Sequence, residues 1–236
     1  MIERSVKTLT GKISIKIPSQ LTELKLGQLM QMQAMKQLSD LDAISILSGI
    51  PIAELKNVVH FSEFDVFGEA ILSLSSQIKY LYDSEAIPNK IIFDIDGKKT
   101  SIKVIRNLSM QPAGAFMASR DIIAEEISNH IKQHGEDDWQ QNFNPSLKAC
   151  CQVLAQYFYC RATGNVYDEY KAEQFAETIK TLGVTEALPI AKYFFMSYLG
   201  LSMQRTGFWQ RLLQLWRKKP AYRLSKSLSI SIPSTH

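Results

Sequence analysis

Hydrophobic and polar residues alternate with a period of two along a short stretch near the start of the chain. Ile13, Ile15 and Ile17 fall on one face of this stretch, and lysine and serine occupy the other. Such alternation predicts a half-buried β-strand over residues 12–17. Pro18 ends this strand because proline has no N–H group to donate to a sheet.

After this strand the hydrophobic period changes to that of an α-helix. We predict a helix that begins at Thr22 or Lys25, ends near Met35 and is rich in methionine and glutamine. These residue types favour helix and bring little charge. A methionine-rich face is either an adaptable docking surface or an irregular filling of the core.

Further helices are expected in the next fifty residues. Asp40 is a candidate N-cap for a short helix that ends at Gly49. Pro51 begins another helix, at a first-turn position where its missing N–H costs nothing. A longer helix then starts at Ser62 or Asp65, with apolar residues at helical spacing.

A β-hairpin is predicted over residues 91–105. Two β-branched runs flank the dipeptide Asp96-Gly97, and Asp-Gly tolerates the positive φ angles of a tight primed turn. After Pro112, apolar residues at helical spacing predict a long helix over residues 113–133.

The densest helical periodicity of the chain follows Asn144, which is a candidate cap for the first helix there. Glycines interrupt the pattern twice. The short connections that result indicate antiparallel neighbours and hence a helical bundle. The helices expected in this bundle cover residues 145–161, 167–182 and 185–201.

Residues 208–219 predict an amphipathic helix, with aromatic residues and leucines on one face and arginine, lysine and glutamine on the other. Beyond Pro220, apolar residues alternate with serine, which predicts a serine-rich strand or tail. This strand could pair with residues 12–17 or with a neighbouring subunit. The residues expected to bind partners are Phe208, Trp209, Arg211, Leu212, Trp216, Arg217, Lys218, Lys219, Leu228, Ile230 and Ile232.

These elements together predict an α+β fold that is mainly α. An N-terminal strand, helices and a β-hairpin come first, and an antiparallel helical bundle and a basic C-terminal arm follow. The expected divisions are an N-terminal α/β portion over residues 1–134, a polar linker over 135–144, the helical bundle over 145–206, and the basic amphipathic helix with its serine-rich strand or tail over 207–236.

The formal net charge of +4 conceals an uneven distribution. Residues 187–236 contain eight lysines or arginines and no acidic residue, and the preceding residues carry 19 basic against 23 acidic side chains. This asymmetry indicates that the C-terminal part meets something acidic, either a nucleic acid, a membrane surface or a neighbouring protein. The apolar runs fall short of the roughly 18 residues of a membrane span, and no apolar signal segment opens the chain, so we expect a cytosolic protein.

The sequence offers no motif for a metal or a cofactor. Cys150, Cys151 and Cys160 are an odd, closely spaced set, which favours free thiols in a core. His130 and His134 lie one helical turn apart, but no glutamate follows His130 as in the zinc proteases. Glycine-rich phosphate loops are also missing from the sequence. We therefore expect no catalytic, cofactor-binding or metal-binding residue.

One short run is similar to a catalytic motif. The residues IIFDIDG at 91–97 resemble the first motif of haloacid-dehalogenase-like phosphatases. The resemblance implies that Asp94 would attack phosphorus and that Asp96 would act as general acid or base. Lys98 and Lys99, however, lead into a second strand where that family enters a loop toward helices. A hairpin turn is the preferred interpretation, and the phosphatase is a remote alternative.

Four interpretations remain open for the amphipathic helix over residues 208–219. It could pack on the core of its own chain or insert into a groove of a partner subunit. Trp209 and Trp216, opposite basic residues, would also suit a membrane interface. The same basic residues would suit the backbone of a nucleic acid.

Four short motifs follow one another along the chain: LKLGQL at residues 24–29, VLAQYF at 153–158, YDEY at 167–170 and FF at 194–195. With the early strand and the hairpin ahead of a helical half, this layout resembles virion and tail-assembly proteins of tailed phages of Bacteroidota, including crAss-like phages. The resemblance spans most of residues 11–200.

The resemblance implies a non-enzymatic structural or assembly subunit of a tailed bacteriophage, at the neck, the tail or the head–tail junction. Its partners would be further copies of itself and other virion or assembly proteins, in the virion or the host cytoplasm. A ring of copies around DNA would bring the basic C-terminus near the nucleic acid, and contact with a membrane is not expected. The alternative is a protein that binds a membrane surface or a nucleic acid through the basic C-terminal helix.

Overall fold

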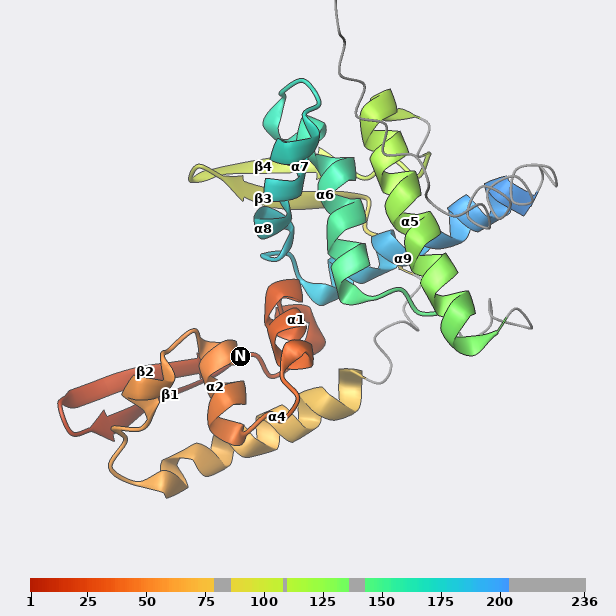
Figure 1. Ribbon diagram of the computed structural model, residues 1–236. Helices are drawn as coiled ribbons and strands as arrows, with labels where there is room; N and C mark the ends of the chain where they lie inside the picture. Colours follow the sequence, from red (N-terminus) through yellow and green to blue (C-terminus); the bar gives the residue numbers. More distant parts are fainter. Residues whose placement is uncertain (79–85, 108–109, 136–142, 204–236) are drawn as a thin grey trace, which may run out of the picture. The chain divides into compact units, whose positions relative to one another are not determined.

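The computed structural model describes residues 1–78, 86–107, 110–135 and 143–203, with side-chain environments up to Tyr198. Residues Met1–Tyr198 form one compact unit, which is the subject here. Across the described residues helices dominate and the strands form two small antiparallel hairpins (Figure 1). The predicted fold class, α+β and mainly α, is confirmed.

The elements follow one another along the chain in the order used in Figure 1. Their bounds are β1 Ile2–Thr8, β2 Gly11–Ile17, the 3₁₀ helix η1 Leu21–Glu23, α1 Leu26–Ala34, α2 Asp40–Ser48, α3 Ile52–Leu55, the 3₁₀ helix η2 Phe61–Phe64, α4 Asp65–Ile78, β3 Lys90–Ile95, β4 Lys98–Lys103, α5 Ala113–His134, α6 Leu147–Thr163, α7 Glu169–Gln174, α8 Ala176–Ile179 and α9 Val184–Met203.

The strand predicted over residues 12–17 is present as β2, and its partner is a strand that the patterning did not predict. β1 pairs with β2 in antiparallel register, with Arg4 opposite Ile15 and Val6 opposite Ile13. Val6 and Thr8 are buried, and Arg4 on the same face is exposed. A charged residue and a threonine on the inward side hide the alternation that would have revealed β1.

Local capping residues explain the short helix α2. The Ser39 hydroxyl accepts from the Asp42 N–H at 3.2 Å and the Asp42 carboxylate accepts from the Ser39 N–H at 3.1 Å, which is a reciprocal capping arrangement. The cap is therefore Ser39, and the prediction of Asp40 was wrong by one residue. Gly49 ends α2 in the left-handed region at φ 75°, as predicted.

Helix α6 is the core of the second half of the unit. Its buried residues lie on every side of the helix, and it packs against α1, α5, α7, α8 and the β3–β4 hairpin. The Phe158 ring lies 5.1 Å from the Phe93 ring of β3, and the Tyr157 ring lies 4.6 Å from the Phe194 ring of α9. A helix that is apolar over most of its surface must be surrounded by other elements, and α6 is, with Lys148 near its start as an exposed exception.

Two predicted details of the bundle are wrong. The cap of α6 is Ser146, whose hydroxyl accepts from the Ala149 N–H at 3.2 Å, and not Asn144. The helix predicted over residues 167–182 is two short helices, α7 and α8. Phe175 separates them because its ψ of −13° tightens the turn there.

Helix α5 begins at Ala113, after Pro112, as predicted, and packs against α6. The helices before and after the expected linker at 135–144 thus share one core. The Ser146 N–H also donates to the Glu126 carboxylate at 2.6 Å, which joins the start of α6 to α5. The predicted divisions at residues 1–134, 135–144, 145–206 and 207–236 stay predictions.

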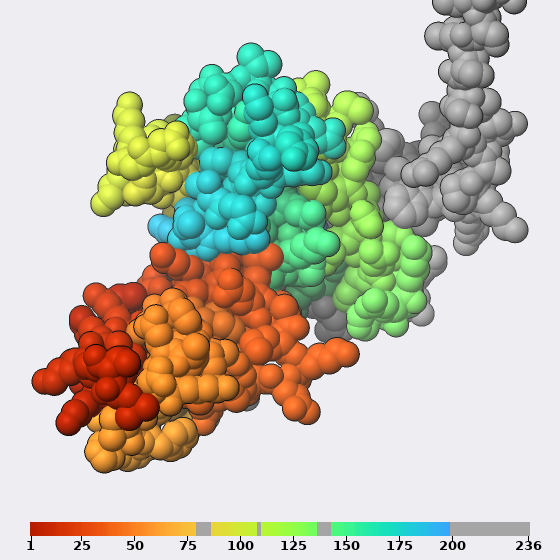
Figure 2. Space-filling view, turned by 60° about the vertical axis from the view of Figure 1, so that its left-hand side comes forward, coloured from red at the N-terminus to blue at the C-terminus, as the bar shows by residue number. Residues whose placement is uncertain are grey.

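A backbone clamp joins the entry of α1 to the connection between α8 and α9. The Leu26 N–H donates to the Leu182 carbonyl at 2.8 Å, the Gly27 N–H to the Lys180 carbonyl at 2.9 Å, and the Val184 N–H to the Leu24 carbonyl at 2.9 Å. In the space-filling view the orange surface of the early helices meets the blue surface of the chain after α8 (Figure 2). We call this contact the 24–184 clamp.

Gly27 is required for the 24–184 clamp. A Cβ atom on Gly27 would lie 2.9 Å from the Lys180 Cβ and 3.1 Å from the Lys180 carbonyl oxygen, so Gly27→Ala must push the two segments apart. We expect its free energy of unfolding to fall by about 1–3 kcal/mol, the usual cost of overpacking. Denaturant unfolding followed by circular dichroism measures this change.

Gly68→Ala is the matched control, because Gly68 lies within α4 and a Cβ atom added there would meet no other atom within 4 Å. Alanine favours a helix over glycine by about 0.5–1 kcal/mol, so this variant should gain stability. Equal effects of the two substitutions would contradict the role given to the clamp.

Candidate functional site

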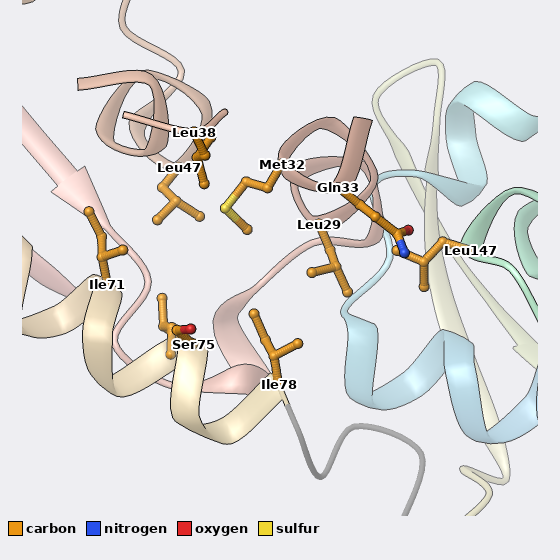
Figure 3. Close-up of a pocket in the computed structure, with 10 residues that line it drawn as sticks. Leu29, Met32, Gln33, Leu38, Leu47, Ile71, Ser75, Ile78 and Leu147 are labelled. Atoms are coloured by element: carbon orange, nitrogen blue, oxygen red, sulfur yellow. The ribbon is translucent and has the colours of Figure 1, made fainter. Parts of the chain in front are cut away.

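An apolar groove of about 370 Å³ opens between α1, α2 and α4. Figure 3 shows side chains from these helices, and from the connection between α1 and α2, pointing toward the same space. We call it the α1–α2–α4 groove. The residues that line it are Leu29, Met32, Gln33, Leu38, Leu47, Ile71, Leu74, Ser75, Ile78 and Leu147.

Helical spacing places these side chains in one groove. On α4, the lining residues Ile71, Leu74, Ser75 and Ile78 are separated by three or four positions and so share one face. The Gln28 side-chain amide donates to the Leu47 carbonyl at 2.9 Å and holds α1 against α2. The groove is thus bordered by elements with fixed local contacts.

The lining is suited to binding apolar side chains. Gln33 and Ser75 supply its polar atoms, and none of the lining residues is titratable. The lining residue Leu38 is 41% exposed, and Met35, three residues before it in the chain, is 38% exposed. The volume of this open recess lies within the range of about 300–1,000 Å³ typical of binding sites. Its lining offers a ligand mainly apolar contacts.

The methionines of α1 help to form this surface. Met32 lines the groove and is half-buried, and Met30 on the same helix is also half-buried. The unbranched thioether side chain adapts its shape to different neighbours. Met32 lies at an open surface, and both interpretations that the sequence left open for these methionines, a docking surface and core filling, stay predictions.

The helices around the groove carry negative charge. α2 contributes Asp40 and Asp42, α4 contributes Asp65 and Glu69, and α1 contributes no charged residue. Lys36 lies in the connection between α1 and α2. The hydrogen bonds from Ser39 and, to a smaller extent, the charge of Lys56, which follows α3, lower the pKa of Asp42. With Glu54 and Glu63 included, residues 26–78 carry six carboxylates against these two lysines. The surroundings of the groove therefore favour a basic ligand over an acidic one.

The two aspartates of the phosphatase-like run lie on the predicted hairpin. Asp94 is exposed on β3 opposite Lys99 of β4, and Asp96 is exposed in the turn. Asp96 has φ 52° and Gly97 has φ 78°, the two positive angles of a type I′ turn. The hairpin and its turn are confirmed, and the position of Asp96 has a conformational explanation.

The histidine pair lies at the end of α5. The His130 and His134 rings stack with centroids 4.3 Å apart, and the His134 Nδ1 lies 3.1 Å from the His130 carbonyl oxygen. That nitrogen is therefore directed at the backbone of its own helix. Within the described ranges, no group of three His, Cys, Asp or Glu side chains is placed to hold a metal ion.

The cysteines of α6 are free thiols, as predicted. Burial is the main reason that the pKa of Cys150 is strongly raised and that of Cys151 is raised to about 11. Since the thiolate is the nucleophilic form, such thiols are inert near neutral pH. They belong to the core and are not candidates for a reactive site.

The partner-binding residues predicted between Phe208 and Ile232 lie outside the described residues. The α1–α2–α4 groove, which the structure does describe, was not predicted as a site. Its lining comes from residues 29–47, 71–78 and 147, and apart from the composition of α1 the sequence gives no signal that these residues meet in space. The methionine-rich pattern of α1 was a partial signal.

Comparison with protein-family models, curated proteins and solved structures finds no match to this chain. Among the described residues, none of the helices has the length and apolar character to cross a bilayer.

The two roles considered for Asp96 make different predictions. Asparagine tolerates positive φ as aspartate does, so Asp96→Asn should leave the free energy of unfolding within about 0.5 kcal/mol of the original value. Asp96→Val places a β-branched residue at φ 52° and should cost about 1–2 kcal/mol. Thermal unfolding of both variants measures the difference.

A magnesium-dependent phosphate-ester hydrolysis that Asp94→Asn abolishes would instead support the phosphatase.

Proposed function

We propose that this protein is a non-enzymatic structural or assembly subunit of a tailed bacteriophage that acts through protein–protein contacts in an oligomer. The observation that carries the proposal is the open, apolar α1–α2–α4 groove, which has no titratable side chain in its lining. A groove of this composition supports recognition of another macromolecule and provides no group for acid–base or nucleophilic chemistry.

Further exposed apolar residues support a role in association. Leu9 and Phe61 are 77% and 66% exposed, and the Leu9 N–H donates to the Asn57 carbonyl at 3.0 Å, which places the turn after β1 beside the connection that leads to Phe61. Clustered apolar side chains at a surface mark interaction sites more often than singly scattered ones do. A partner that covers them removes apolar area from water at a gain of about 25 cal/mol per Å².

The assignment to a phage rests on the resemblance over residues 11–200 to virion and tail-assembly proteins. On this basis we propose that the protein lies at the neck, the tail or the head–tail junction, in the virion or the host cytoplasm. An uneven charge along the chain supports repeated association, since the basic end of one copy can attract the acidic remainder of the next. A ring of such copies around DNA would bring the basic end close to it.

Self-association is the first expected outcome. The purified full chain should show a mass above that of the monomer by light scattering at concentrations up to about 100 μM, where a contact of micromolar affinity is largely occupied. Raising the salt concentration should lower this mass, because charge attraction contributes to it.

A chain that stays monomeric under these conditions, and that does not bind phage structural proteins expressed with it, would contradict the proposal. Binding of the monomer to duplex DNA or to anionic vesicles, lost when Arg217, Lys218 and Lys219 become glutamate, would instead favour the alternative that the basic C-terminal helix binds a nucleic acid or a membrane surface.

A further inference from the structure

The α1–α2–α4 groove has the features of a receptor for an amphipathic helix. Side chains on α4 line it at positions i, i+3, i+4 and i+7, and Met32 and Leu47 face them from the other helices (Figure 3). Grooves of this kind bind a helix through a few apolar anchors that are spaced by three or four residues. The exposed Leu38 at the border leaves the groove accessible from solvent.

The chain itself contains a segment with the required pattern. Residues 208–219, which follow the described part, place Phe208, Leu212 and Trp216 at positions i, i+4 and i+8. A helix of this length extends about 18 Å, and aromatic residues are the most frequent anchors in protein interfaces. The segment therefore supplies the apolar anchors that the groove can hold.

The charges of the groove and of this segment are opposite. Residues 204–236 contain seven lysines or arginines and no acidic residue. Residues 26–78, which supply the whole lining of the groove except Leu147, carry six carboxylates, Asp40, Asp42, Glu54, Glu63, Asp65 and Glu69, against Lys36 and Lys56. Opposite charge speeds association and selects between ligands of similar shape. A basic amphipathic helix is favoured over an acidic one for this reason.

We propose that the α1–α2–α4 groove binds residues 208–219 of a second copy of this chain. The inference rests on the proposed function as an oligomeric subunit, and it names the contact that joins the copies. Phe208, Leu212 and Trp216 occupy the groove between Leu38, Leu47 and Ile71. Each copy then offers one groove and one C-terminal segment, so the contact is heterologous and joins copies head to tail.

Substitutions on the two sides of this contact test it in the full chain. Leu38→Glu places a carboxylate in the groove at a residue that is 41% exposed, and Trp216→Ala removes an anchor from the segment. Each should raise the dissociation constant for self-association at least about tenfold, measured by light scattering over a dilution series. Val166→Glu is the control, because Val166 is 90% exposed and does not line the groove, and it should leave the constant unchanged.

Mixing the two variants identifies the partners of the contact. The Trp216→Ala chain keeps an intact groove, and the Leu38→Glu chain keeps an intact segment. An equimolar mixture should therefore form a pair through one intact contact, although each variant alone is monomeric. Ser75→Arg is a second groove variant, at an exposed helical position, and should behave as Leu38→Glu does if that variant has lost its native circular dichroism spectrum.

The outcomes separate the inference from the proposed function. A wild-type chain that is monomeric overturns both. A wild-type oligomer that neither Leu38→Glu nor Ser75→Arg weakens overturns the inference alone, because the copies then meet through another surface. Variants that are monomeric alone and remain so when mixed also overturn it, since the groove and the segment would not be each other's partners.

Discussion

The extensive burial of α6 is the constraint on which the rest of the described unit depends. Buried residues such as Leu154 and Phe158 lie on every side of this helix, although Lys148 near its start is exposed, so each surrounding element must present an apolar side to it. The hairpin supplies Phe93, the last helix supplies Phe194, and α5 supplies its buried face. Tyr157 adds a directional contact, because its hydroxyl donates to the Ile105 carbonyl at 2.7 Å and so fixes the end of the hairpin.

The 24–184 clamp is a different kind of constraint, because it is made by backbone atoms. It joins the entry of α1 to the second half of the unit through hydrogen bonds that do not depend on side-chain identity. Only the close approach at Gly27 makes a demand on the sequence. These hydrogen bonds fix the first turn of α1. The side chains of its later turns, including the flexible Met32, are therefore free to line the groove.

The sequence predicted those parts of the fold that are determined locally. Asp96-Gly97 specified the hairpin turn, Gly49 specified the end of α2, and the periodicity of residues 147–163 specified α6. Features set by distant residues were missed. β1 is stabilised by its pairing with β2, and its own pattern is obscured by Arg4. The candidate site escaped prediction for the same reason, since α1, α2 and α4 form a groove only when they are folded together.

The buried thiols of α6 have a consequence for the environments in which the protein can work. The Cys150 and Cys151 sulfur atoms lie against the carbonyl oxygens of Pro145 and Ala176, and burial keeps both groups protonated. Oxidants and glutathione act on exposed thiolates, so these two side chains are indifferent to a change of redox conditions. Among the three free thiols of this helix, a response to redox conditions is therefore confined to Cys160, which is half-buried.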